Sequence, residues 1–178
     1  LGDVYKRQAL GAVGGYGKIR ITNAAPFSTL GDNAVNAATL CPGDANAPIH
    51  SIAITGSNIG PCDAGYDITQ FTINTAGSYQ ASDISALHLY STTVPTFTNP
   101  VLLATNNNPT GAGAQTFTGF SYGMSTGTNY LWVTADLSGT ANGNRTILVN
   151  ATQPADLTVG TLPTGTSAAS ASQTFADV

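Results

Sequence analysis

The sequence predicts an all-β fold, an antiparallel β-sandwich of about nine short strands. Three observations support this prediction. Only 8% of the 178 residues are charged and Glu is absent, so the chain lacks residues that commonly fill exposed helix faces. Thr, Val, Ile, Tyr and Phe, which suit pleated and half-buried surfaces, are plentiful. Twenty Gly and nine Pro divide the chain into short segments, as turns between strands require.

Alternation of polar and apolar residues places the strands in order. Residues 18–23 alternate, with Ile19 and Ile21 on one face. Pro26 and residues 31–33 are expected to be turns. The remaining expected strands are 34–40, 49–55, 67–75, 85–91, 101–104, 115–120, 129–137, 145–152 and 156–162, and residues 173–178 are a candidate last strand. At this length a Greek-key, immunoglobulin-like sandwich is the commoner solution for such a pattern.

Two of these strands fix their own orientation. In residues 85–91, Leu87 and Leu89 face inward if His88 and Tyr90 face outward. In residues 129–137, Leu131, Val133, Ala135 and Leu137 lie opposite the face that carries Tyr130, Trp132, Thr134 and Asp136. The second face is therefore the one on which polar and aromatic side chains gather.

The domain organisation follows from these strands. Residues 46–165 are expected to form the sandwich, and residues 166–178 a tail or last strand. Residues 9–45 are expected to be an N-terminal extension with one or two strands, exchanged between subunits in one interpretation. Residues 3–8 read DVYKRQ, which resembles the translation of a sequence used to tag DNA in sequencing libraries of environmental samples. Residues 1–8 are therefore set aside from fold reasoning.

Charge and hydropathy limit the classes of partner. The net charge is −4 with five basic residues, which offers no electrostatic footprint for nucleic acid or an anionic membrane surface. No stretch approaches the roughly 20 consecutive apolar residues of a membrane span. The expected partners are copies of the same chain, in a homopolymer, or surface glycans.

Cys41 and Cys62 flank one expected strand. In a secreted protein they are expected to form a disulfide that closes a loop and contributes on the order of 3 kcal/mol. In a cytosolic protein they would be two buried thiols. With two His in the chain, these spacings match no zinc pattern, and no cofactor is expected.

Three segments resemble a known bacterial domain family. They are residues 83–91 (DISALHLYS), 95–100 (PTFTNP) and 127–137 (GTNYLWVTADL). These are similar to the domain found N-terminal to BNR-repeat neuraminidases, in secreted and surface proteins of bacteria, and the similarity covers roughly residues 46–150. The resemblance implies a β-sandwich, an extracellular or cell-surface location and an accessory role. The neuraminidase chemistry of those proteins belongs to a separate propeller domain, so the resemblance carries no catalytic residue over.

Catalysis is not expected from the residues either. Paired carboxylates for glycoside hydrolysis must converge across a cleft, whereas Asp63, Asp67, Asp83, Asp136 and Asp156 stand at expected strand ends and turns. His50 and His88 lie within expected strands, without a neighbouring nucleophile. The Asn-rich residues 106–111 offer oxygen ligands for Ca²⁺ but lack the alternating acids of a dedicated calcium loop.

Two functional hypotheses remain. The first is a non-catalytic extracellular structural module, a self-assembling subunit of a surface filament joined by strand addition, because a strand that precedes the recognised domain can complete a neighbour's sheet. Its candidate exchange residues are Lys18, Ile19, Arg20, Ile21, Thr22 and Asn23. The alternative is a carbohydrate-binding or adhesive accessory domain in which Tyr90, Tyr130 and Trp132 stack on sugars. The competing interpretation of Trp132 is that it belongs to the core.

Overall fold

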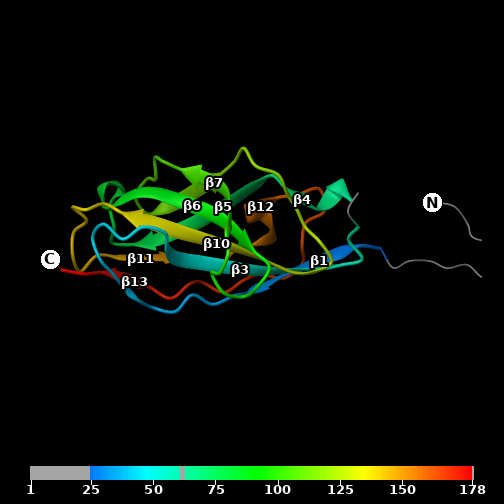
Figure 1. The fold of residues 1–178 in the computed structure, drawn as a ribbon, viewed down its shortest axis with the longest axis horizontal. Coiled ribbons are helices and arrows are strands. Elements are labelled where there is room, and N and C mark those ends of the chain that lie inside the picture. Colours follow the sequence, from blue (N-terminus) through cyan, green and yellow to red (C-terminus); the bar gives the residue numbers. More distant parts are fainter. Residues whose placement is uncertain (1–24, 61–62, 178) are drawn as a thin grey trace, which may run out of the picture.

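The computed structural model describes residues 25–60 and 63–177 (Figure 1). These residues form two main β-sheets packed face to face, which confirms the predicted all-β sandwich. The candidate exchange strand at residues 18–23, the set-aside residues 1–8 and Cys62 lie outside the described residues. The described part contains thirteen strands, nine of which have three or more residues. Greek-key, immunoglobulin-like connectivity stays a prediction.

One sheet, named here the β10 sheet, has five antiparallel strands in the order β1-β3-β10-β6-β7. Their bounds are β1 (Phe27–Asp32), β3 (Ala47–Ser57), β10 (Gly127–Leu137), β6 (Ile84–Thr92) and β7 (Val101–Asn106). Figure 1 shows β3, β10 and β6 running nearly the length of the molecule. The chain order along this sheet is mixed, because β10 comes from late in the sequence and lies between two early strands.

The second sheet, the β5 sheet, has β5 (Gln70–Gly77) at its centre. On one edge β5 pairs with β8 (Gly113–Phe117), and on the other with β11 (Thr146–Val149) and β12 (Leu157–Thr158). β11 pairs in turn with β13 (Gln173–Phe175), which pairs in parallel with β2 (Thr39–Leu40). A separate two-stranded sheet joins β4 (Asp67–Ile68) to β9 (Tyr122–Gly123).

The hydrophobic core lies between the two main sheets. Alternate residues of β6 and β10 face inward as predicted, and those of β5 and β11 meet them from the other side. Nine core side chains from these four strands are at most 1% exposed: Leu87, Leu89, Leu131, Val133, Ala135, Phe71, Ile73, Ile147 and Val149. Burying apolar area of this kind is the main force that holds two sheets together.

The structure corrects several boundaries. Residues 31–33 were expected to be a turn, but Gly31 and Asp32 extend β1, where they pair with Ala53 and Ile52 of β3. The single strand expected at 67–75 is two strands, because Ile68 pairs with Tyr122 in the small sheet. β9 was not expected at all. In each case pairing with a distant segment decided the outcome, which local alternation does not report.

The two strands described before residue 46 pair inside the sandwich, β1 with β3 and β2 with β13. The candidate last strand is present as β13. The described helical elements are three turns of three residues: η1 (Ala64–Tyr66), η2 (Ala81–Asp83) and η3 (Pro154–Asp156). Accordingly, none of the helices in the described parts of the chain has the length and apolarity needed to cross a membrane.

Candidate functional site

β7 is the outermost strand of the β10 sheet and pairs with β6 alone. Val101 and Leu102 at its start are 61% and 52% exposed. Leu103 and Ala104, further along, pack partly against the core. Leu89 and Tyr90 of β6 pair with Ala104 and Leu102, so Leu103 is the extra residue of a bulge in β7, where the side chains change from exposed to partly buried. Within residues 25–60 and 63–177, the outer backbone edge of β7 therefore has no strand partner.

The sequence segment around β7 carries no protecting Lys, Arg, Asp or Glu, although Pro100 directly precedes the strand and Asp136 lies two strands away. Edge strands of natural sheets commonly hold Lys, other charges or Pro, which prevent pairing with another chain. Here no Lys, Arg, Asp or Glu occurs between Asp83 and Asp136. Val94, in the loop before β7, is a further apolar side chain at 40% exposure. β7 therefore combines an unpaired backbone with an apolar and uncharged surface.

Two other outer strands, β1 and β8, differ from β7, although Phe27 at the start of β1 is also 52% exposed. β1 is covered on its free side by the segment around Thr164, whose carbonyl accepts the N–H of Leu30 and whose N–H donates to Ser28 O, at 2.7 and 3.0 Å. β8, at the edge of the β5 sheet, turns Gln115 and Phe117 inward and exposes Ala114 and Thr116. β7 is thus the one of these three edge strands with large exposed apolar side chains at an unpaired edge.

The outer face of the β10 sheet carries the aromatic residues singled out in the sequence. Trp132 lies directly opposite Tyr90 across the β6–β10 pair, and Tyr130 lies two residues along β10. Phe97 packs on both rings, with centroids 5.6 Å from Trp132 and 5.3 Å from Tyr90. Trp132 is 6% exposed and its indole N–H donates to Thr92 Oγ1 at 3.0 Å. Trp132 is therefore buried, but on the outer face of the sheet beneath Phe97 and not in the core between the two sheets. Phe97 was the cover that the sequence reasoning missed.

A network of hydrogen-bonded side chains, named here the His88 network, links β7 to β6 and β10 on the same face. The imidazole of His88 on β6 is hydrogen-bonded through Nδ1 to Thr105 Oγ1 of β7 and through Nε2 to Asp136 Oδ2 of β10, both at 3.0 Å. The second oxygen of Asp136 accepts the N–H of Asn46 at 2.7 Å. Burial alone would raise the pKa of Asp136, but Asn46 and His88 outweigh it and the pKa lies below its usual value.

The Thr105–His88–Asp136 network has the residue types of a nucleophile, a base and an orienting acid, but its geometry favours a structural role. Both imidazole nitrogens of His88 and both oxygens of Asp136 are already engaged by protein neighbours. The three side chains come from three adjacent strands, so their bonds hold Thr105 and the C-terminal half of β7 in register with β6 and β10. The His88 network thereby stabilises the position of β7 at the edge of the sheet.

Four of the aspartates close turns. In each of them the side chain accepts the backbone N–H three residues earlier, at 2.6–2.7 Å: Asp44, Asp63, Asp83 and Asp156. Each also donates its own N–H to the carbonyl of that same residue. The short Asp side chain closes such a turn in the manner of an Asx motif. These four are half of the eight Asp residues that follow residue 24.

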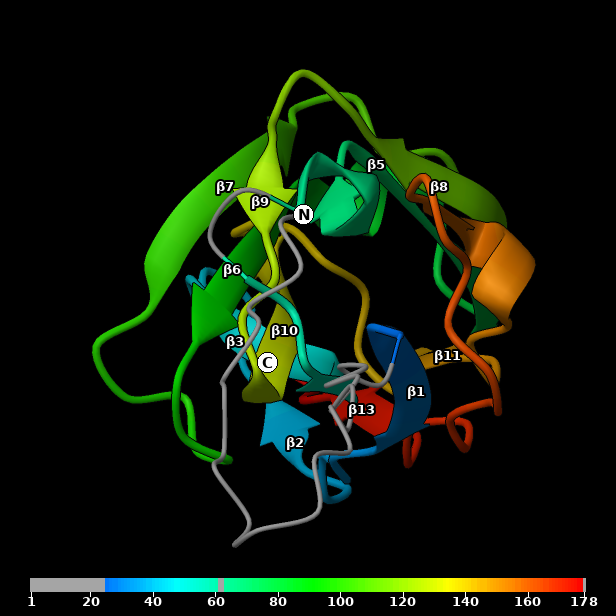
Figure 2. The same cartoon turned by 90° about the vertical axis from the view of Figure 1, so that its right-hand side faces the viewer.

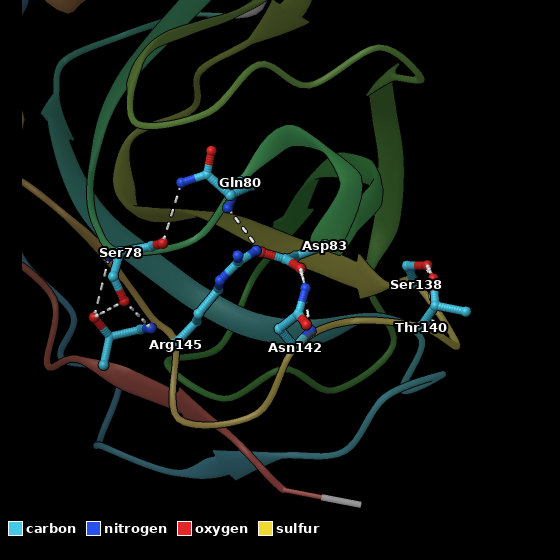
Figure 3. Close-up of polar contacts among 8 residues, drawn as sticks. Ser78, Gln80, Asp83, Ser138, Thr140, Asn142 and Arg145 are labelled. Carbon is cyan, nitrogen blue, oxygen red and sulfur yellow. Dashed lines mark hydrogen bonds and ion pairs between the residues drawn. The ribbon is translucent and has the colours of Figure 1, made fainter.

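Asp83 carries the strongest of these networks (Figure 3). Its carboxylate is fully buried and receives Arg145 Nη1 at 2.7 Å, in addition to the N–H groups of Gln80 and Asn142. Burial would raise the pKa of Asp83, but these donors lower it below its ordinary value. The network joins the turn before β6 to the turn before β11, one strand from each main sheet.

His50 lies in the interior. It is 1% exposed and its Nε2 is 2.9 Å from Thr152 Oγ1 in the segment after β11. Burial lowers the pKa of His50 to about 4. A small pocket of about 60 Å³ adjoins it, lined among others by Asp32, Asn33 and Ser51. A volume of this size holds no more than a few waters.

The remaining sequence candidates stay as follows. Cys41 is exposed, and its expected partner Cys62 lies outside the described residues, so the disulfide stays a prediction. The oxygens of the Asn-rich loop are used internally, because Gln115 bonds to Thr110 and Gly111, and Asn106 Oδ1 accepts the N–H of Asn108. Across the described ranges, no three His, Cys or Asp side chains gather in a group that could hold a metal ion.

Comparison with known proteins adds no relative. No protein-family model matches the chain, and no curated protein matches it. The resemblance to the domain N-terminal to BNR-repeat neuraminidases therefore stays a prediction, and the functional argument depends on the geometry of β7 and its surroundings.

Proposed function

We propose that this chain is a non-catalytic extracellular structural module that self-assembles into a surface filament by strand addition. The observation that carries the proposal is the outer edge of β7, which is unpaired among the described residues and bears exposed Val101 and Leu102. Strand addition uses such an edge, because main-chain hydrogen bonds supply affinity and exposed side chains supply apolar contact.

Several further features support the proposal. The His88 network holds β7 in position. An incoming strand would therefore meet a preformed edge, and little ordering of β7 would be needed on binding. The very low charge content removes the usual obstacle to edge pairing. An extracellular location is supported by the resemblance to secreted bacterial domains. The burial of Trp132 under Phe97 favours assembly over the carbohydrate-binding alternative.

A charge placed on β7 tests the proposal. In Leu102→Lys, a charged group stands at the exposed start of the edge and would be desolvated by an added strand, so assembly should be lost. The matched control is Ala114→Lys on β8, which adds the same charge at an exposed position of the other sheet. Light scattering and electron microscopy over a range of concentrations are the measurements. We expect the wild type and Ala114→Lys to assemble and Leu102→Lys to stay monomeric.

The outcome that contradicts the proposal is a wild-type chain that remains monomeric at every concentration. Equal assembly of Leu102→Lys and the wild type would instead exclude β7 as the acceptor. Circular dichroism and the urea midpoint of each variant show whether the fold is retained.

A further inference from the structure

The basic residues of this chain are almost all in its first 24 residues. Lys6, Arg7, Lys18 and Arg20 lie there with one acid, Asp3, whereas the rest of the chain has eight Asp and one Arg, a net charge of −7. Excluding residues 1–8 still leaves Lys18 and Arg20 with no acid in residues 9–24. A basic segment therefore precedes an acidic body. This complementarity favours contact between the segment of one copy and the body of another.

The same segment contains the alternating residues 18–23, and chain length limits where they can pair. β1 begins at Phe27, and four residues of extended chain span at most about 14 Å, so Asn23 lies within that distance of Phe27. The position beside β7 is five strand spacings from β1 in the order of the β10 sheet, or about 24 Å at about 4.8 Å each. Figure 2 shows β7 and β1 on opposite sides of the molecule.

We infer that residues 18–23 of one copy add as a strand to the outer edge of β7 in a second copy. The inference rests on the proposed function and names its donor and acceptor. Ile19 and Ile21 share one face of the donor and would extend the apolar surface of Leu103 and Ala104, which reach the core only partly. Lys18 and Arg20 lie on the opposite face of the donor from Ile19 and Ile21. They would therefore stay away from the apolar contact.

The contact between donor and acceptor is not self-complementary. The donor precedes β1 at one edge of the β10 sheet, and the acceptor β7 is the opposite edge. Donor and acceptor surfaces are different, so the contact is heterologous, and an open assembly has one free donor at one end and one free acceptor at the other. Such a contact generates a continuing filament unless its rotation closes a ring.

Mixing two defective full-length chains tests the inference. Ile19→Asn/Ile21→Asn removes the apolar face of the donor and keeps β7. Leu102→Lys removes the acceptor and keeps the donor, and Val101→Lys replaces it should Leu102→Lys fail to fold. We expect each variant alone to be monomeric by light scattering. Their equimolar mixture should give a heterodimer of twice the 18.0 kDa chain mass, because one intact donor meets one intact acceptor.

The controls separate the two proposals. Thr22→Asn changes a residue on the other donor face and should assemble like the wild type. A mixture that stays monomeric while the wild type assembles overturns the donor–acceptor pairing and leaves self-assembly standing. Assembly of Ile19→Asn/Ile21→Asn alone also overturns it, since β7 would then pair with another element, such as β7 of a second copy. A monomeric wild type overturns both proposals.

Discussion

At the scale of single residues, Asp83 is the most consequential charge in the described structure. Its buried carboxylate holds Arg145 and closes the turn before β6. Asp83→Ala would leave the Arg145 side chain, which is 31% exposed, and the N–H groups of Gln80 and Asn142 without their acceptor, which costs about 3 kcal/mol. We expect Asp83→Ala to lower the free energy of unfolding by about that amount in urea titrations.

Asp156 is the matched control for Asp83. It closes the turn before β12 with the same 2.7 Å bond from the backbone N–H of Gln153, and among the described residues it forms no ion pair. Asp156→Ala should therefore cost only about 1 kcal/mol, as loss of a cap does. Equal losses in the two variants would mean that the Arg145 contact adds nothing to the turn.

His50 makes stability depend on pH. Its pKa is about 4 in the folded protein and near 6.5 when unfolded, so the unfolded state binds more protons between these values. Stability from the neutral imidazole is complete above pH 6.5 and falls as the pH drops toward 4, by about 3 kcal/mol. His50→Gln should lose this dependence in urea titrations at pH 7, 6, 5 and 4. A constant difference between wild type and variant over that range would contradict the assignment.

At the scale of elements, the end of β5 depends on one glycine. Gly77 has φ +116° and pairs with Ile147, and an added Cβ would lie 2.2 Å from the carbonyl oxygen of Thr146. Gly127, at the start of β10, has φ +108° with open space around it. Both Ala variants carry backbone strain of about 1–3 kcal/mol, but only Gly77→Ala forces β5 and β11 apart.

Thermal unfolding should therefore show Gly77→Ala to be less stable than Gly127→Ala by about 2 kcal/mol or more. Protection of the Leu148 amide from hydrogen exchange should fall only in Gly77→Ala, because this residue belongs to the β5–β11 pair. Matching stabilities would show that the clash relaxes without disturbing the pair.

The elements also show what the sequence could predict. Alternation gave the inward and outward faces of β6 and β10, because each strand has one core face and local spacing reports it. β1 was missed since Gly31 and Asp32 are turn formers that pairing with β3 holds in an extended strand. The place of β7 at the edge of a sheet depends on long-range strand order. The charge-free stretch between Asp83 and Asp136 was the signal available for an unprotected edge.

At the scale of the whole molecule, charge and topology separate two ends with different properties. The sandwich carries one Arg against eight Asp, and the other four basic residues precede the first described strand. In the proposed assembly the edge of β7 is the acceptor. The outer face of the sheet beside β7 is stabilised by the packing of Phe97 on Trp132 and by the His88 network. Under the proposed assembly, the sandwich would therefore serve mainly to hold one edge strand in place.

The Asp83–Arg145 pair has a consequence for survival among proteases. Trypsin cleaves after Lys and Arg, and from residue 21 onward Arg145 is the sole such residue. Its guanidinium is held by the buried carboxylate of Asp83, which keeps it out of a protease specificity pocket while the fold persists. Trypsin-like proteases would thus spare the sandwich while it is folded. In the proposed assembly the donor strand is free before incorporation, so cleavage after Arg20 would remove Lys18, Ile19 and Arg20 from free subunits, and only incorporated subunits would keep their connecting strand.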